Sequence, residues 1–208
     1  MKKLVFILLL IFTSSAMTQS KKGFFDLSGP KRIWVLFHPF KAKKSYRISI
    51  ETNKVSDSIA KTDLLDGDRT GGQVDAFRHA YWMARLRQEI GKSAARSLGK
   101  AHEKENYQTF KKRQLEDGAV PDEISSIMDL HNNEEGLKLV KNRSKISQEK
   151  LIQKVVNAIK SGKMKIIKKD KKGNFLTIEG DIIPKESLKG KWKNNKCLVA
   201  SNYTYKNT

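Results

Sequence analysis

The sequence almost lacks cysteine: Cys197 is the only one in 208 residues. One thiol cannot form an intrachain disulfide, so the stability of the fold must come from packing. A metal site of the CxxC type is excluded for the same reason. Internal repeats, low-complexity tracts and a recognisable boundary between domains are also absent. The length is sufficient for one domain with a hydrophobic core.

Long apolar segments are missing as well. The run Leu4–Phe12 is too short to cross a bilayer. Two lysines precede it and small polar residues follow it, a pattern typical of a signal peptide. We therefore expect residues 1–20 to be a signal peptide and the mature chain to have no transmembrane segment. The protein is expected to be exported, either periplasmic or secreted, with residues 21–208 forming a single, mostly helical domain.

Acidic residues are scarce, because 22 Asp and Glu stand against 42 Lys and Arg, which gives a net charge of +20. The excess is concentrated in residues 138–208, where nineteen basic residues face five acidic ones. This basic C-terminal part favours contact with nucleic acid, or with anionic lipid or another acidic envelope component. A Lys-rich surface that only keeps the protein soluble is the alternative.

Apolar residues recur at helical spacing over most of the chain, which predicts a mainly α fold, a helical bundle. The run Ile33–Phe37 fits either a short helix or a strand. We expect helices over residues 41–61, 73–90, 93–107, from Pro121 onward, and 146–159. The β-prone runs 164–167 and 174–178 predict a small C-terminal β-hairpin.

Three of the four histidines lie in one segment, the motif core of residues 71–136. Each has a carboxylate beside it in sequence or one helical turn away. Histidine suits proton transfer near neutral pH and metal ligation, so this concentration predicts a functional site. The candidate catalytic residues are Asp75, His79, His102, Glu103, Asp129, His131, Asn132 and Asn133.

The spacing within the core suggests a chemistry for each group. Asp75 and His79 are four residues apart, so a helix places them on one face. The carboxylate could then accept a hydrogen bond from one ring nitrogen and leave the other as a base or metal ligand. The neighbours His102 and Glu103 differ by about 100° around a helix, so they cannot both point squarely into one site.

Two chemical arrangements remain open if three antiparallel helices bring these faces together. His79, His102 and His131, with a nearby carboxylate, could bind a divalent metal such as zinc and leave one position for water. A metal-free site with one histidine as general base is the other arrangement. Buried polar residues on facing helices can also simply satisfy one another's hydrogen bonds.

Three motifs in the core resemble the signature of a known family. They are Asp75–Trp82 (DAFRHAYW), Ala101–Glu103 (AHE) and Met128–Asn133 (MDLHNN), the last followed by Gly136. The family is an uncharacterised bacterial domain of unknown function, found in small exported proteins and at the ends of large secreted, toxin-like proteins. The resemblance implies that the histidines, Glu103, Asp129 and the asparagines belong together, and it favours an enzyme.

The leading hypothesis is therefore an exported hydrolase, metal-assisted or metal-free, that acts on an anionic substrate such as a phosphodiester or an envelope component. The competing hypothesis is a non-catalytic exported binding protein whose His/Asp/Asn cluster is a structural polar core. Thermal unfolding of a His79→Gln variant separates the two hypotheses.

Overall fold

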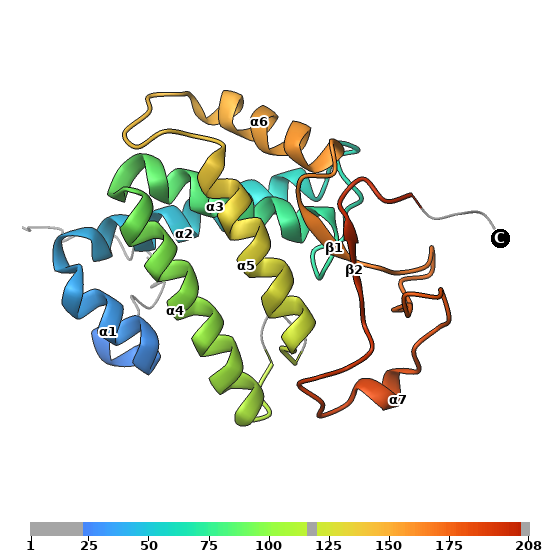
Figure 1. Ribbon diagram of the computed structural model, residues 1–208. Coiled ribbons are helices and arrows are strands. Elements are labelled where there is room, and N and C mark those ends of the chain that lie inside the picture. The colour runs from blue at the N-terminus through green and yellow to red at the C-terminus, as the bar shows by residue number, and fades with distance from the viewer. Residues whose placement is uncertain (1–22, 116–119, 205–208) are drawn as a thin grey trace, which may run out of the picture.

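The computed structural model describes residues 23–115 and 120–204, and the expected signal peptide lies outside these ranges. Within them the chain is mainly helical with one small sheet (Figure 1), so the predicted fold class is confirmed. No helix in the described ranges is long and apolar enough to span a membrane. The elements in order are the 3₁₀ helix η1 (Phe24–Asp26), α1 (Gly29–Phe37), α2 (Pro39–Ile59), α3 (Gln73–Ile90), α4 (Lys92–Lys111), α5 (Glu123–Lys138), α6 (Gln148–Lys160), β1 (Lys165–Ile167), α7 (Lys185–Leu188) and β2 (Leu198–Ala200).

Helix α3 is the centre of the bundle, in contact with α2, α4, α5 and α6. Glycines bound it on both sides: Gly72 is its N-cap, and Gly91 ends it at a φ of 86°, a conformation that favours glycine. Phe77 and Tyr81 on one side of the helix and Leu86 on another are all fully buried. Polar residues on α3 therefore face other helices as well.

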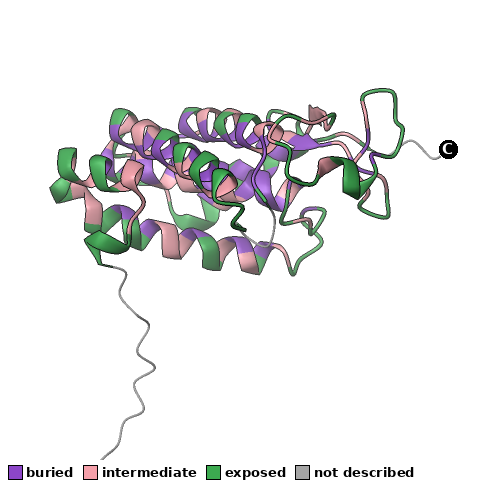
Figure 2. Cartoon of the chain, turned by 90° about the horizontal axis from the view of Figure 1, so that it is seen from below, coloured by how far each residue is buried: buried purple, intermediate pink, exposed green. Residues whose placement is uncertain are grey.

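Two apolar clusters surround α3, and Figure 2 shows the buried faces of the helices turned toward one another. The first contains Phe77 with Leu151 and Ile159 of α6 and Ile166 of β1. The second joins Leu86 to Trp34 of α1 and to α4. Burial of each such side chain contributes about 1.5–3 kcal/mol, so these contacts fix the order of the helices around α3.

Small residues let α5 approach α3 closely. A Cβ atom on Gly136 would lie 2.3 Å from the carbonyl oxygen of Ala80, a distance that no packed structure tolerates. Gly99 of α4 faces α5 in a similar way, since its Cβ would lie 3.3 Å from the Asn133 amide. The close approach brings the polar residues of α5 next to those of α3 and α4.

The pairing in the sheet differs from the predicted hairpin. β1 pairs antiparallel with β2, with Ile166 opposite Val199. The expected partner run 174–178 makes only isolated bridges, Lys169 with Phe175 and Leu176 with Ile182. The short run 198–200 is also β-prone, and the residues just before it are anchored at the N-terminus of α5, where Lys196 Nζ lies 2.6 Å from Asp122 Oδ2.

Both edges of β1 have hydrogen-bond partners. On the side away from β2, the Asn132 side chain accepts from Lys165 N at 2.8 Å and donates to Lys165 O at 2.9 Å. Ile167 N donates to Gly71 O at 2.7 Å on the same side. β1 is therefore attached to both α5 and the loop before α3.

The helices agree with the sequence prediction to within a few residues. The range of α3 is the predicted one, α4 is four residues longer at its C-terminal end, and Ile33–Phe37 is helical as part of α1. Asp122 is the N-cap of α5 and accepts from Ser125 N at 2.8 Å, so this helix begins two residues after Pro121. The division into a leader and a single domain stays a prediction.

Candidate functional site

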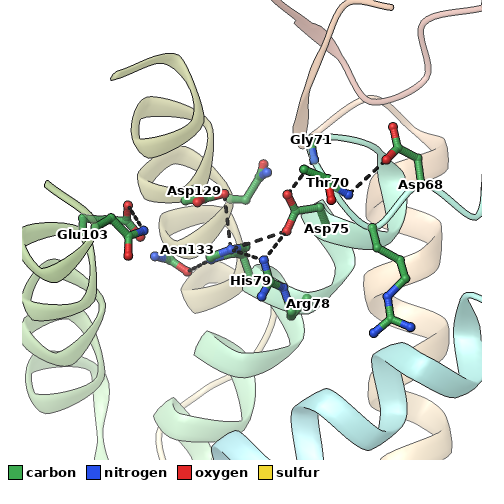
Figure 3. A network of polar contacts seen from close by, with 12 residues as sticks. Asp68, Thr70, Gly71, Asp75, Arg78, His79, Glu103, Asp129 and Asn133 are labelled. Carbon is green, nitrogen blue, oxygen red and sulfur yellow. Dashed lines mark hydrogen bonds and ion pairs between the residues drawn. The ribbon is translucent and has the colours of Figure 1, made fainter. Parts of the chain in front are cut away.

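Two carboxylates and an imidazole converge where α3 meets α5. His79 Nε2 lies 3.6 Å from Asp75 Oδ1 and 3.3 Å from Asp129 Oδ1. Exposed fractions of 7%, 3% and 7% place Asp75, His79 and Asp129 in the interior. Figure 3 shows the three side chains pointing toward one another from the two helices. We call these three residues the His79 cluster.

Asn133 orients the imidazole of His79 from the other side. His79 Nδ1 lies 3.3 Å from Asn133 Oδ1, so a proton on Nδ1 donates to the amide oxygen. The neutral ring then has its lone pair on Nε2, directed at the two carboxylates. In this tautomer a cation beside Nε2 is favoured, and an outer hydrogen bond of this kind prepares a histidine for metal ligation.

The cluster has the dimensions of a three-ligand metal site. One ligand atom from each of its residues lies within 4.8 Å of the other two, and no other group of this kind occurs among residues 23–115 and 120–204. Zinc bonds of about 2.0–2.1 Å in tetrahedral geometry separate neighbouring ligand atoms by about 3.4 Å. The two separations from Nε2, 3.3 and 3.6 Å, bracket that value.

Asp75 is held in place by the backbone of the preceding loop. Gly71 N donates to Asp75 Oδ2 at 2.7 Å, and Gly71 has a φ of 83° that favours glycine. Because Ile167 N donates to the carbonyl of the same glycine, β1 fixes the loop that fixes Asp75. The C-terminal sheet thus supports a residue of the cluster.

Arg78 supplies positive charge to the cluster in this structure. Its guanidinium Nη2 lies 2.6 Å from Asp75 Oδ1 and 3.4 Å from His79 Nε2. From the sequence, Arg78 could either bind a phosphate or lie in solvent, and solvent was the favoured interpretation, although Arg78 precedes His79 and lies three residues from Asp75 on the helix. Arg85, the other arginine of this face, is instead paired with Glu51 at 2.8 Å and belongs to the packing of α2 against α3.

His102 lies beside the cluster and is oriented by Glu105. Its ring centroid is 6.3 Å from that of His79, and its Nδ1 is 3.4 Å from Glu105 Oε2. Burial alone would raise the pKa of Glu105, but hydrogen bonds from His102 and Lys31 lower the pKa to about 2. Glu105 is therefore a carboxylate at neutral pH and accepts a hydrogen bond from Nδ1–H of His102. Nε2 is then the basic atom of the His102 ring.

Three of the predicted site residues lie apart from the cluster. His131 Nε2 contacts the carbonyl oxygen of Lys163 at 3.0 Å, and Asn132 bonds the backbone of β1. Glu103 is buried beside Asn106, whose Nδ2 donates to Glu103 Oε2 at 3.2 Å. The set of three histidine ligands is thus not assembled: His131 is two residues from Asp129, which rotates it by about 200° around α5.

Two neighbouring hollows give access to the cluster. A recess of about 60 Å³ is lined by Asp75, His79, His102 and Asp129, among others. A larger cleft of about 330 Å³ lies between α2, α3 and the loop joining them. Arg69, Thr70 and Arg78 line both hollows, so the recess and the cleft are continuous along these residues.

The fold and the site together define a helical-bundle protein with a buried His/Asp cluster at its centre. The family described as "Domain of unknown function (DUF6973)" matches residues 32–163, more than half of the chain. The chain belongs to this family, and the expected resemblance to an uncharacterised domain is confirmed. The matched range contains all three motifs and ends before β1. No curated protein and no solved structure matches the chain.

Proposed function

We propose that the protein is a hydrolase whose His79 cluster binds a divalent metal ion such as zinc. The observation that carries this proposal is the convergence of three ligand atoms, from Asp75, His79 and Asp129, on a recess that can admit water. Catalytic zinc sites have three protein ligands and a fourth position for water or substrate. A site that only stabilised the fold would be closed by a fourth protein ligand.

The His79 cluster and the residues that orient its neighbours have separate roles in this proposal. A divalent ion would lower the pKa of a water molecule and polarise the substrate. Asp75, His79 and Asp129 would hold the ion, Asn133 would keep His79 Nε2 directed at it, and His102 with Glu105 would move the proton. Hydrolysis forms a bond from the water oxygen to the electrophilic centre and breaks the bond to the leaving group. His102 carries the proton from the water to the leaving group.

The test is hydrolysis by the purified mature protein of chromogenic phosphodiester, phosphomonoester and carboxyl ester probes. We expect turnover that stops after treatment with a chelator and returns when zinc or another divalent metal is added. Asp129→Asn should lose activity by about 10²-fold or more, because a metal ligand is weakened. His131→Gln should keep it. Absence of turnover on every probe, together with absence of metal binding, would refute the proposal.

The competing function, a binding protein with a structural polar core, is favoured by a specific pair of contacts. His131 and Asn132 come from the same motif as Asp129, and both bond the backbone of the C-terminal segment. If the amide of Asn133 were reversed, His79 Nε2–H would donate to the carboxylates and no metal would be required. Thermal unfolding with and without divalent metal distinguishes the two arrangements.

The same proposal extends to partners and location. The basic C-terminal part, residues 138–208, supports binding of nucleic acid or of an anionic envelope component or lipid, and the N-terminal pattern supports export to the periplasm or medium. Binding of DNA and of anionic vesicles should weaken steeply between 50 and 200 mM salt, since each neutralised phosphate releases counterions. Binding that is absent or insensitive to salt would leave only the solubility explanation.

A further inference from the structure

The cleft next to the His79 cluster has the composition of an anion site. It encloses about 330 Å³, a volume at the lower end of the range for small-molecule pockets. Two arginines from different elements line it, Arg69 from the loop before α3 and Arg78 from α3. The other lining residues are the polar Asn53, Ser56 and Thr70, the acidic Asp57 and the apolar Val74.

Neither guanidinium is permanently committed to its present partner. Arg69 pairs with Asp57, and both side chains are about half exposed, at 57% and 47%. An ion pair so exposed contributes only about 0–1 kcal/mol, so an anion in the cleft can compete with Asp57. Arg78 donates to Asp75, whose charge a bound metal ion would neutralise. Metal binding would therefore increase the affinity of Arg78 for another anion.

A buried hydroxyl in the wall of the cleft supports the same conclusion. Ser56 is 3% exposed, and its Oγ has no hydrogen-bond partner among the described residues. A buried hydroxyl without a partner destabilises the fold, and such groups are often retained for a ligand. Phosphate oxygens accept hydrogen bonds from hydroxyls and bind arginine in a bidentate manner.

We propose that the cleft binds the phosphate group of a phosphate ester, with Arg69 and Arg78 as its charged ligands and Ser56 as a hydrogen-bond donor. Arg78 and Thr70 line both the cleft and the recess, so a phosphate bound there is next to the His79 cluster. As the substrate class of the hydrolase, this inference rests on the proposed function. As a phosphate site in the absence of metal, it stands on Arg69 and Ser56, since the argument for Arg78 includes a bound metal ion.

The experiment titrates inorganic phosphate into the mature protein in the presence of a chelator and follows binding by calorimetry. Arg69→Gln should weaken phosphate binding about tenfold, the loss of one charge-assisted hydrogen bond. Asp57→Asn should strengthen it, because the competing carboxylate is removed. Arg47→Gln is the matched control: Arg47 is exposed on α2 and does not line the cleft, so its replacement should leave the affinity unchanged.

Ser56→Ala adds a readout of a different kind. The variant should unfold at the same or a higher temperature than the wild type, because a buried hydroxyl without a partner is removed, while phosphate binding becomes several-fold weaker. This combination is not expected of a residue that only packs α2 against α3.

The outcomes separate the cleft from the hydrolase. Equal weakening by Arg69→Gln and Arg47→Gln would show unspecific attraction to a basic surface and overturn the inference. Metal binding and ester hydrolysis without any effect of Arg69→Gln or Ser56→Ala would overturn it as well, with the proposed function intact. Phosphate binding that follows the four variants as expected, in a protein that binds no metal, would support the site and refute the hydrolase.

Discussion

The dependence of thermal stability on divalent metal is the most informative consequence of the His79 cluster. The perturbation is His79→Gln, which removes the imidazole that lies 3.3 Å from Asp129 and 3.6 Å from Asp75. Glutamine retains an amide near Asn133 but is a poor ligand for zinc. The matched variant is His131→Gln, a histidine of the same segment whose Nε2 bonds a backbone carbonyl outside the cluster.

The magnitude follows from linkage. A ligand present at 100 times its dissociation constant stabilises the native state by about 2.7 kcal/mol. For a chain of 150–250 residues, 1 kcal/mol shifts the melting temperature by about 2–4 °C, so metal should raise it by about 5–11 °C in the wild type. His79→Gln should lose this shift and melt, without metal, close to the wild-type temperature. His131→Gln should keep the shift.

The assay is thermal unfolding by circular dichroism in chelator, zinc and magnesium for the three proteins. An architectural cluster gives the opposite pattern: His79→Gln would lose about 1–3 kcal/mol from a buried partner left without its hydrogen bond, and metal would shift none of the proteins. That pattern would refute the metal site. A shift of equal size in wild type and His79→Gln would also refute it, since the metal would then bind elsewhere.

Three further predictions follow from the packing and the electrostatics. Gly136→Ala should destabilise the fold by about 1–3 kcal/mol in urea unfolding, because its methyl group meets the backbone of α3, while an unchanged midpoint would contradict the close approach. Asn132→Ala should expose the Lys165 amide to faster hydrogen exchange, and unchanged protection would show that β1 needs no partner from α5. The lowered pKa of Glu105, about 2 against an ordinary 4.5, means that its contribution to stability is complete above about pH 5 and is lost as the pH falls toward 2. In a plot of melting temperature against pH, Glu105→Gln should therefore fall less steeply on the acid side than the wild type. Curves of wild type and variant that fall in parallel would contradict this.

Local patterns in the sequence were sufficient to predict the helices and, at the site, the residue pairs within α3 and within α5. The range of α3 follows from its period and the glycines at its ends, and the pair Asp75 and His79 follows from a spacing of four residues. The inclusion of Asp129 and Asn133 follows from the same rule on a second helix. In each case the information lies within one or two turns of helix.

Contacts between distant segments could not be read in the same way. β1 pairs with a strand about thirty residues away. Nothing in the local composition of residues 174–178 indicates that this run would not form a strand paired with β1. His131 was grouped with His79 because both are histidines, but the rotation of α5 directs it toward the C-terminal segment. Arg78 was predicted to lie in solvent for a similar reason. An arginine beside a buried carboxylate resembles a solvated one until the facing helix is known.

The hydrogen bonds along β1 have a consequence for the behaviour of the protein at high concentration. A strand with an unpaired edge can add a strand from another molecule, which is a common beginning of aggregation. In this chain the side-chain amide of Asn132 and the carbonyl of Gly71 bond the edge of β1 that faces away from β2. The Lys165 amide and carbonyl and the Ile167 amide are therefore already bonded when a second molecule approaches. One asparagine serves both to fix α5 against the C-terminal segment and to keep neighbouring molecules from joining this edge of the sheet.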